Sequence, residues 1–264
     1  MKTPLRTLIC ALALASAVAA APAAANPGLQ RVHGGPGTSA TLHDGVLTMH
    51  WQGGRSRVQV PAGYALPAVT TRGQLGGLSH SGRTAVLAGR YSGGRSHFMI
   101  AESGELTPLA LRGRVTFDAL SPDGSRLYLT RRASQTDATK YTVLTYSRAE
   151  SKLTPVVTKV IFSAAGTEQP DGWTMQGVAL ARSTTASGQW VYTLYSSREY
   201  PFIHALPVGQ GGWAACIELP ESWRARAGSL RLRAGAGMTV DVLNARGEVI
   251  ASGNIQSAKL TLAT

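Results

Sequence analysis

The sequence predicts an all-β fold, a β-propeller of about five to six blades, either regular or with an irregular or partial blade. The first observation is a repeat 42 residues apart, because segments 78–87 and 120–129 each form a tight turn that leads into an apolar strand. The second observation is a Leu-Thr-Pro triplet at 106–108 that recurs at 153–155, 47 residues later. Recurrence at about 40 to 45 residues is the period of a propeller blade.

The first residues predict a secretory signal peptide that is cleaved after residue 25. Lys2 and Arg6 precede an apolar run from Leu8 to Ala21, and the small residues Ala23–Ala25 follow. A membrane anchor is the less favoured alternative, because the run is shorter than the ~20 apolar residues that a membrane span needs. We therefore expect no transmembrane segment in the mature chain.

Cleavage sets the expected domain organisation and compartment. Residues 1–25 are the signal peptide, residues 26–40 are a flexible segment rich in Gly and Pro, and residues 41–264 are the propeller domain. The expected location is outside the cell, or in the periplasm or cell envelope.

The two ends of the propeller domain are expected to close the ring. Residues 46–51 and 57–60 flank a glycine turn and alternate in polarity, which predicts a hairpin. This hairpin is interpreted as a partial first blade completed by a strand from elsewhere. The last expected strand, residues 258–262, would close the ring by pairing with it and so remove exposed edges.

The expected strands of the other blades follow the same plan of turn and apolar run. In the second and third blades they lie at 84–89, 96–100, 105–109, 125–130, 140–146 and 151–156. In the fourth and fifth blades they lie at 178–182, 190–195, 202–206, 214–219, 230–233, 238–243 and 248–251. Gly188 follows Gly124 by 64 residues, and an inserted loop around residues 162–172 accounts for the excess over one period.

The turn at residues 121–128, Ser-Pro-Asp-Gly-Ser-Arg-Leu-Tyr, resembles the repeat of TolB-type, WD-like propellers. Pro presets φ, Asp bonds the turn backbone and Gly accepts a positive φ. The turn at 79–82 departs from the motif, because His-Ser replaces Pro-Asp. Residues 190–195, 202–206 and 216–220 also resemble exported propeller-like proteins of actinobacterial type. These resemblances imply fold and export, and no activity.

The chain is strongly basic. Its formal net charge is +12, and removal of Lys2 and Arg6 with the signal peptide leaves +10. Such a charge favours anionic partners. However, 21 of the 26 basic residues are Arg beside abundant Ala and Gly. A GC-rich codon bias explains this composition and is favoured over selection for anion binding.

One cysteine, Cys216, remains after cleavage, so no intramolecular disulfide is possible. It is either a buried small apolar residue or a reactive thiol. Burial is favoured, because its sequence neighbours include no Lys, Arg or His that would lower its pKa.

Motifs for catalysis are absent from the sequence. It contains no His-Glu-x-x-His, no Cys-x-x-Cys, no P-loop and no dinucleotide-binding glycine motif. Ser79 and Ser81 are interpreted as turn residues, since their setting lacks the spacing of a nucleophile elbow. The histidines have no paired spacing, so neither a metal nor a cofactor is predicted.

Two surfaces are candidates for binding. The first is a rim of aromatic and cationic residues near a strand connection, expected to contact a peptide or glycan. It comprises Arg182, Tyr195, Arg198, Tyr200 and His204. The equal alternative is that Tyr192 and Tyr195 pack between blades.

The second surface is a basic stripe on which period-2 alternation exposes arginines opposite leucines. It comprises Arg224, Arg226, Arg231 and Arg233. A solvated outer strand face is the favoured interpretation, and a docking patch for acidic polymer, anionic lipid or an acidic partner is the alternative. Nucleic acid is not expected as a partner of an exported chain.

These features together predict a monomeric, noncatalytic binding or scaffolding module of the cell envelope or extracellular space. Its expected partner is a protein, a peptide or an anionic envelope polymer of unknown identity. The alternative function is a propeller hydrolase or lyase with its active site in the central channel.

Overall fold

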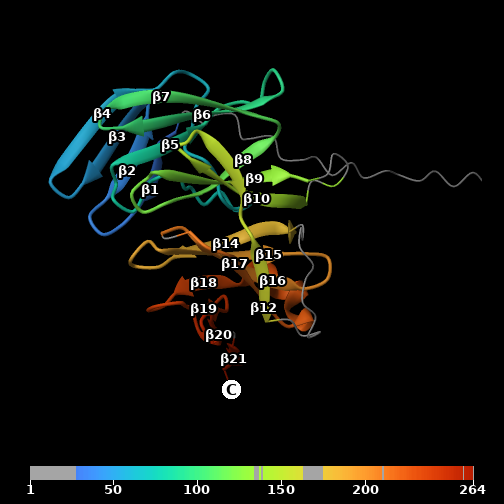
Figure 1. Ribbon diagram of the computed structural model, residues 1–264. Helices are drawn as coiled ribbons and strands as arrows, with labels where there is room; N and C mark the ends of the chain where they lie inside the picture. The colour runs from blue at the N-terminus through green and yellow to red at the C-terminus, as the bar shows by residue number, and fades with distance from the viewer. Residues whose placement is uncertain are drawn as a thin grey trace, which may run out of the picture.

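The computed structural model describes residues 28–133, 137, 139–162, 175–209, 211–257 and 259–263. Figure 1 shows the first strands in the upper part of the view and β14–β21 in the lower part. The predicted signal peptide, and the predicted inserted loop from residue 163 on, lie outside the described residues.

The described strands form five sheets, built mainly from consecutive antiparallel strands. The first sheet contains β1 (Gln30–His33), β2 (Ser39–His43), β3 (Val46–Trp51) and β4 (Gly54–Gln59). The second contains β5 (Thr84–Ala88), β6 (Arg95–Glu102) and β7 (Glu105–Arg112). The third contains β8 (Val115–Leu120), β9 (Arg126–Arg132), β10 (Lys140–Ser147) and β11 (Lys152–Pro155), with β13 (Met175–Gln176) paired to β10.

The fourth sheet contains β14 (Val178–Thr184), β15 (Trp190–Ser196), β16 (Pro201–Pro207) and β17 (Ala214–Glu218). Its outer strand is β12 (Thr158–Phe162), which runs parallel to β17. The fifth sheet contains β18 (Arg231–Ala234), β19 (Thr239–Leu243), β20 (Val249–Asn254) and β21 (Lys259–Leu262). The 3₁₀ helix η1 (Glu221–Ser229) connects the fourth and fifth sheets.

Each sheet shares an apolar core with the next sheet along the chain. Pairs of buried residues from successive sheets that share one core are Leu47 with Leu87, Phe98 with Leu129, Tyr128 with Val191, and Ile217 with Val240. A single propeller blade cannot bury its faces alone. Stacking in chain order removes apolar surface from water, and this burial stabilises the fold by about 25 cal/mol per Å². The all-β prediction is confirmed, and the order of packing is the one expected of a propeller.

Most strands lie where the sequence predicts them. The exceptions include β8 and β12, which the turn and repeat pattern did not indicate. In β8 the apolar run is interrupted by Asp118, which is nevertheless buried. Cys216 is buried in β17, as predicted.

Two expectations about the ends of the domain are corrected. The first sheet is complete within residues 30–59, and β1 together with the first two residues of β2 lies inside the segment 26–40 that was expected to be flexible. The last strand, β21, pairs with β20 in the fifth sheet and does not close a ring with the N-terminal hairpin. A local hairpin closes a short loop and so costs less chain entropy than pairing across the whole chain.

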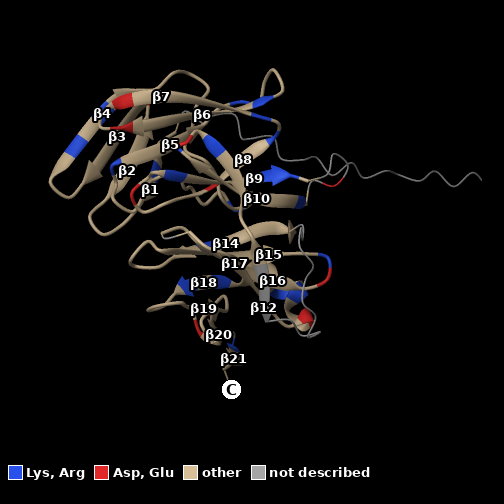
Figure 2. Ribbon diagram, in the orientation of Figure 1, with Lys and Arg blue, Asp and Glu red and all other residues tan. Residues whose placement is uncertain are grey.

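The outer edge of the first sheet is protected by charge. Arg55 and Arg57 on β4 are exposed, and Figure 2 shows β4 marked by basic residues. Charged side chains on an edge strand oppose pairing with other chains. These two arginines therefore have a structural explanation.

The repeated turn has the same hydrogen bonds in three sheets. A hydroxyl oxygen accepts from the backbone N–H five residues later, in Ser79 from Thr84 (3.1 Å), Ser121 from Arg126 (2.9 Å) and Thr185 from Trp190 (3.1 Å). The glycine three residues after each hydroxyl residue donates its N–H to that residue's carbonyl. The predicted equivalence of Gly124 and Gly188 therefore extends to their turn geometry.

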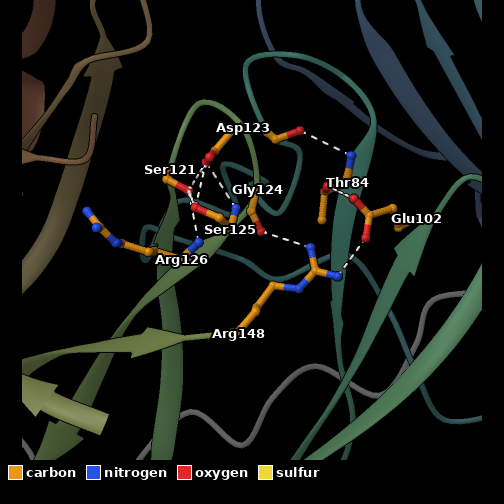
Figure 3. A network of polar contacts seen from close by, with 9 residues as sticks. Thr84, Glu102, Ser121, Asp123, Gly124, Ser125, Arg126 and Arg148 are labelled. Carbon is orange, nitrogen blue, oxygen red and sulfur yellow. Dashed lines mark hydrogen bonds and ion pairs between the residues drawn. The ribbon is translucent and has the colours of Figure 1, made fainter. Parts of the chain in front are cut away.

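Figure 3 shows how the second of these turns joins its neighbouring sheet. Asp123 Oδ1 accepts from Ser121 Oγ (2.6 Å) and from the Ser125 backbone N–H (3.0 Å). Arg148 donates to the carbonyl of Gly124 (3.1 Å) and forms an ion pair with Glu102 (2.6 Å). The turn of the third sheet is thus bonded to β6 of the second.

We expect Gly124→Ala to lower the free energy of unfolding by about 3 kcal/mol in urea denaturation. Gly124 has a φ of +79°, which is unfavourable for alanine. A Cβ there would also lie 2.3 Å from Thr84 Oγ1 of the second sheet.

Gly247→Ala is the matched control. Gly247 has a φ of +85° in a turn of the fifth sheet, and no atom lies within 4 Å of its added Cβ. Gly247→Ala should therefore lower the free energy of unfolding through backbone strain alone, by about 1–2 kcal/mol. Equal losses in the two variants would show that the contact with Thr84 is unimportant.

Candidate functional site

A hollow of about 760 Å³ lies where the inner segments of the first four sheets come together. Most of its lining residues are glycines, apolar residues, serines and threonines. Its lining includes Val32, His33, Gly35, Thr38, Val69, Gln74, Leu78, His80, Phe117, Asp118, Ala119, Arg182, Thr184, Thr185, Gly188 and Val191. A volume of this size suits a small ligand or a short segment of chain.

The segment that precedes β5 runs beside β14 of the fourth sheet. The Thr71 N–H donates to the carbonyl of Ala179 (2.9 Å), and Gln74 Nε2 donates to the carbonyl of Arg182 (3.3 Å). The two residues of each pair are 108 apart in the sequence. This constant offset means that the two segments are parallel.

A buried ion pair between Arg182 and Asp118 lies at the wall of the hollow. Their side chains are 8% and 6% exposed. The guanidinium donates to the carboxylate and to the backbone carbonyl of Asp118, and its Nε donates to Thr193 Oγ1 (3.1 Å). Arg182 on β14 therefore connects β8 of the third sheet with β15 of its own sheet.

His80 occupies one end of the hollow between two glycines. The Gly35 N–H donates to the His80 carbonyl (2.9 Å). A Cβ on Gly35 would lie 2.7 Å from the imidazole, and a Cβ on Gly188 would lie 2.5 Å from it. The substitution of His-Ser for Pro-Asp in this turn therefore places a ring against the first and fourth sheets.

The predicted aromatic rim is largely buried. Tyr195 and His204 are 4% and 1% exposed. This corrects their expected position at a loop tip, because Tyr195 lies on β15, whose residues 191–195 are buried, and His204 lies on β16, where every residue is buried. The ring of Tyr195 lies edge-on to His204, with centroids 6.4 Å apart. Packing within the domain, which the sequence left as the alternative, accounts for both residues.

Three rim residues lie in different settings. Arg198 is exposed in the connection between β15 and β16, and Tyr200 beside it is half-buried. Arg182 is held in its ion pair. The structure therefore leaves Arg198 and part of Tyr200 on the surface.

The predicted basic stripe is divided between two elements. Arg231 and Arg233 are exposed on β18, as the alternation predicts. Arg233 forms an ion pair with Asp241 (2.8 Å). Arg224 and Arg226 lie on the 3₁₀ helix η1, so they do not continue the strand face that carries Arg231 and Arg233.

The two arginines of η1 have local contacts. Arg224 Nη1 donates to the carbonyl of Arg198 (2.7 Å), and Arg226 lies over the ring of Trp223 at 4.5 Å. Arg226 therefore covers an aromatic face as well as contributing charge.

Burial shifts the pKa of several groups beside the ion pair. Burial is the largest cause that lowers the pKa of His204 to about 4. Asp118 opposes it with a smaller raising effect, and Arg182 adds a smaller lowering effect. Burial also raises the pKa of Cys216 and of Tyr141 well above their usual values. At neutral pH these groups are therefore uncharged.

Sequence reasoning missed three residues of this site. Asp118 and Thr185 were not singled out, and His80 was interpreted as a turn residue alone. A single Asp between Phe117 and Ala119 was an available signal, because a carboxylate in an apolar strand is rarely buried without a partner.

In the described ranges, no group of three or more His, Cys, Asp or Glu side chains is placed to hold a metal ion. No helix among these residues is both long and apolar enough to cross a bilayer.

No protein-family model matches the chain, and no curated protein matches it. A putative TolB from Agrobacterium tumefaciens is 12% identical, with 87% of this chain and 78% of that chain covered and a TM-score of 0.44. TolB from Acinetobacter baumannii is 8% identical, with 83% of this chain and 53% of that chain covered and a TM-score of 0.42. This chain thus spans about half of that TolB.

A third solved structure is the β-propeller domain of the Trilobed protease from Pyrococcus furiosus. It is 10% identical, with 89% of this chain and 70% of that chain covered and a TM-score of 0.43. Scores below 0.5 at these identities carry no conclusion about function. The propeller-like arrangement rests on the sheets described above.

We expect Arg182→Met to lower the free energy of unfolding by about 3–5 kcal/mol, because it leaves the Asp118 carboxylate buried without its counter-ion. The double variant Arg182→Met/Asp118→Asn should lose less than the single variant. Urea denaturation of the two single variants and the double variant measures this coupling. Additive losses would contradict a mutual dependence of the two charges.

The buried His204 should make stability depend on pH. Its folded pKa of about 4 is below the unfolded value of 6.5, so the unfolded chain binds more protons between these values. This contribution is present in full above pH 6.5 and is lost as the pH falls toward 4, by about 3 kcal/mol in all. Urea denaturation across this range should show a flatter profile for His204→Leu. An unchanged slope would assign the dependence to other groups.

Proposed function

We propose that this protein is an exported, noncatalytic binding module that holds a short, neutral peptide segment in the hollow between its inner strands. The observation that carries the proposal is the hollow of about 760 Å³ with walls of backbone, apolar side chains and hydroxyls. Binding sites are concave and mostly apolar, with a few polar groups that orient the ligand. Backbone and hydroxyl groups here would pair with peptide N–H and carbonyl groups.

The chemistry of the lining favours binding over catalysis. Among the described lining residues Asp118 is the one carboxylate, and Arg182 already pairs with it. A hydrolase or lyase of the alternative type would need an acid or base free to exchange protons with its substrate. The imidazoles of His33 and His80 are the groups that such an enzyme would have to use.

Export, monomeric state and the outer contacts belong to the same proposal. The basic start, apolar run and small-residue site at the N-terminus support secretion to the periplasm, envelope or exterior. Arg198, Tyr200, Arg224 and Arg231 would serve as contacts for a protein, a peptide or an anionic envelope polymer. The described sheets would act as a rigid support for these groups.

The proposal is tested by placing a large side chain in the hollow. Thr184 is an exposed lining residue, and Thr184→Trp should weaken binding of a peptide selected from a synthetic library by at least tenfold in calorimetry. Thr107→Trp is the matched control, because Thr107 is exposed on β7 and does not line the hollow. Equal weakening in both variants would place binding elsewhere, and cleavage of the bound peptide would support the hydrolase alternative.

A further inference from the structure

Several arginines gather at one end of the second and third sheets. This arginine end comprises Arg90, Arg95, Arg112, Arg114 and Arg132. The first four side chains are exposed and Arg132 is half-buried. Figure 2 shows basic segments gathered where β6, β8 and β9 meet the edge of the upper part.

The antiparallel order of the strands creates this end. β5 and β7 finish there, β6 and β8 begin there, and β9 finishes there. Arg95 pairs with Gly113 in an isolated bridge, and the Arg132 N–H donates to the carbonyl of Arg114 (3.4 Å). The arginines of two sheets therefore form one continuous edge.

The arginine end lacks paired carboxylates in the described part of the chain. None of the four ion pairs found there includes one of its five arginines. At the opposite end of the same strands, Glu102 pairs with Arg148 at 2.6 Å, Glu105 begins β7, and Asp123 lies in the turn between β8 and β9. Codon bias explains why the chain contains many arginines, but it does not explain why one end of these strands lacks paired carboxylates.

Asp137 follows Arg132 by five residues in the chain. This carboxylate accepts from the Thr139 N–H (2.9 Å), and its hydrogen bonds with Thr139 lower its pKa, with smaller lowering effects of Lys140 and Arg198.

One aromatic ring is part of this surface. Tyr91 is 39% exposed, and the guanidinium of Arg114 lies over its ring at 4.5 Å. Stacking of this kind fixes a guanidinium without using its hydrogen-bond donors on another side chain. Arg114 is thus oriented with N–H groups available to a ligand.

We propose that the arginine end binds a linear, phosphate-bearing polymer. Guanidinium groups match phosphate oxygens with two parallel hydrogen bonds, and a row of them suits a repeated anion. A folded protein partner would require a desolvated apolar centre, whereas Tyr91 is the one large apolar residue exposed on this described edge. The proposal is independent of the peptide site in the hollow.

The test measures binding of long-chain inorganic polyphosphate by calorimetry at several salt concentrations. The triple variant Arg90→Gln/Arg112→Gln/Arg114→Gln should lose at least tenfold in affinity. The slope of log affinity against log salt should fall by about three, one for each lost phosphate contact. Arg112→Gln alone should lower the slope by about one, which keeps the test valid if the triple variant is unstable.

The matched control is Arg55→Gln/Arg57→Gln/Arg246→Gln, which removes the same charge from exposed side chains without hydrogen bonds or ion pairs among the described residues. It should bind polyphosphate within twofold of the original chain. Equal losses in both triple variants would show attraction by net charge alone and overturn the proposal. Tighter binding of the original chain to polyglutamate or to phosphatidylglycerol vesicles would also overturn it.

Discussion

The buried pairing of Arg182 with Asp118 is the constraint on which the centre of the molecule depends. The pair joins β14 to β8, and a guanidinium in this position requires a carboxylate within reach because neither charge is solvated. Around it, β14 also accepts bonds from Thr71 and Gln74, in the segment that precedes β5. Polar contacts therefore hold the walls of the hollow together, and the shared apolar cores hold neighbouring sheets against one another.

The turns connect neighbouring sheets by close contact. Gly124 packs against Thr84, and Gly188 packs against the ring of His80. In each case the missing Cβ allows the turn of one sheet to touch another directly. The motif therefore serves packing between repeats as much as reversal of the chain, which explains why its glycine is kept where Pro and Asp are replaced.

Sequence periodicity located most strands because each apolar run is bounded by turn residues with a defined conformational preference. It located β15 and β16 but assigned Tyr195 and His204 to an accessible rim, because alternation cannot identify a central strand that is buried on both faces. The role of Arg182 was equally hidden, since its partner Asp118 is 64 residues away and on another sheet. Contacts of this kind depend on the register between sheets, which the sequence of one strand does not specify.

The position of the fifth sheet in the stack has a consequence for partial unfolding. It shares its apolar core with the fourth sheet, and the Ala234 N–H donates to Ser183 Oγ (2.9 Å) across that boundary. In a linear array of units, stability is roughly a sum over neighbouring interfaces, so a sheet whose described apolar core is shared with one neighbour is held by fewer interfaces than the middle sheets. Residues 231–262 would thus form a cooperative opening unit whose amide hydrogens exchange before those of the middle sheets.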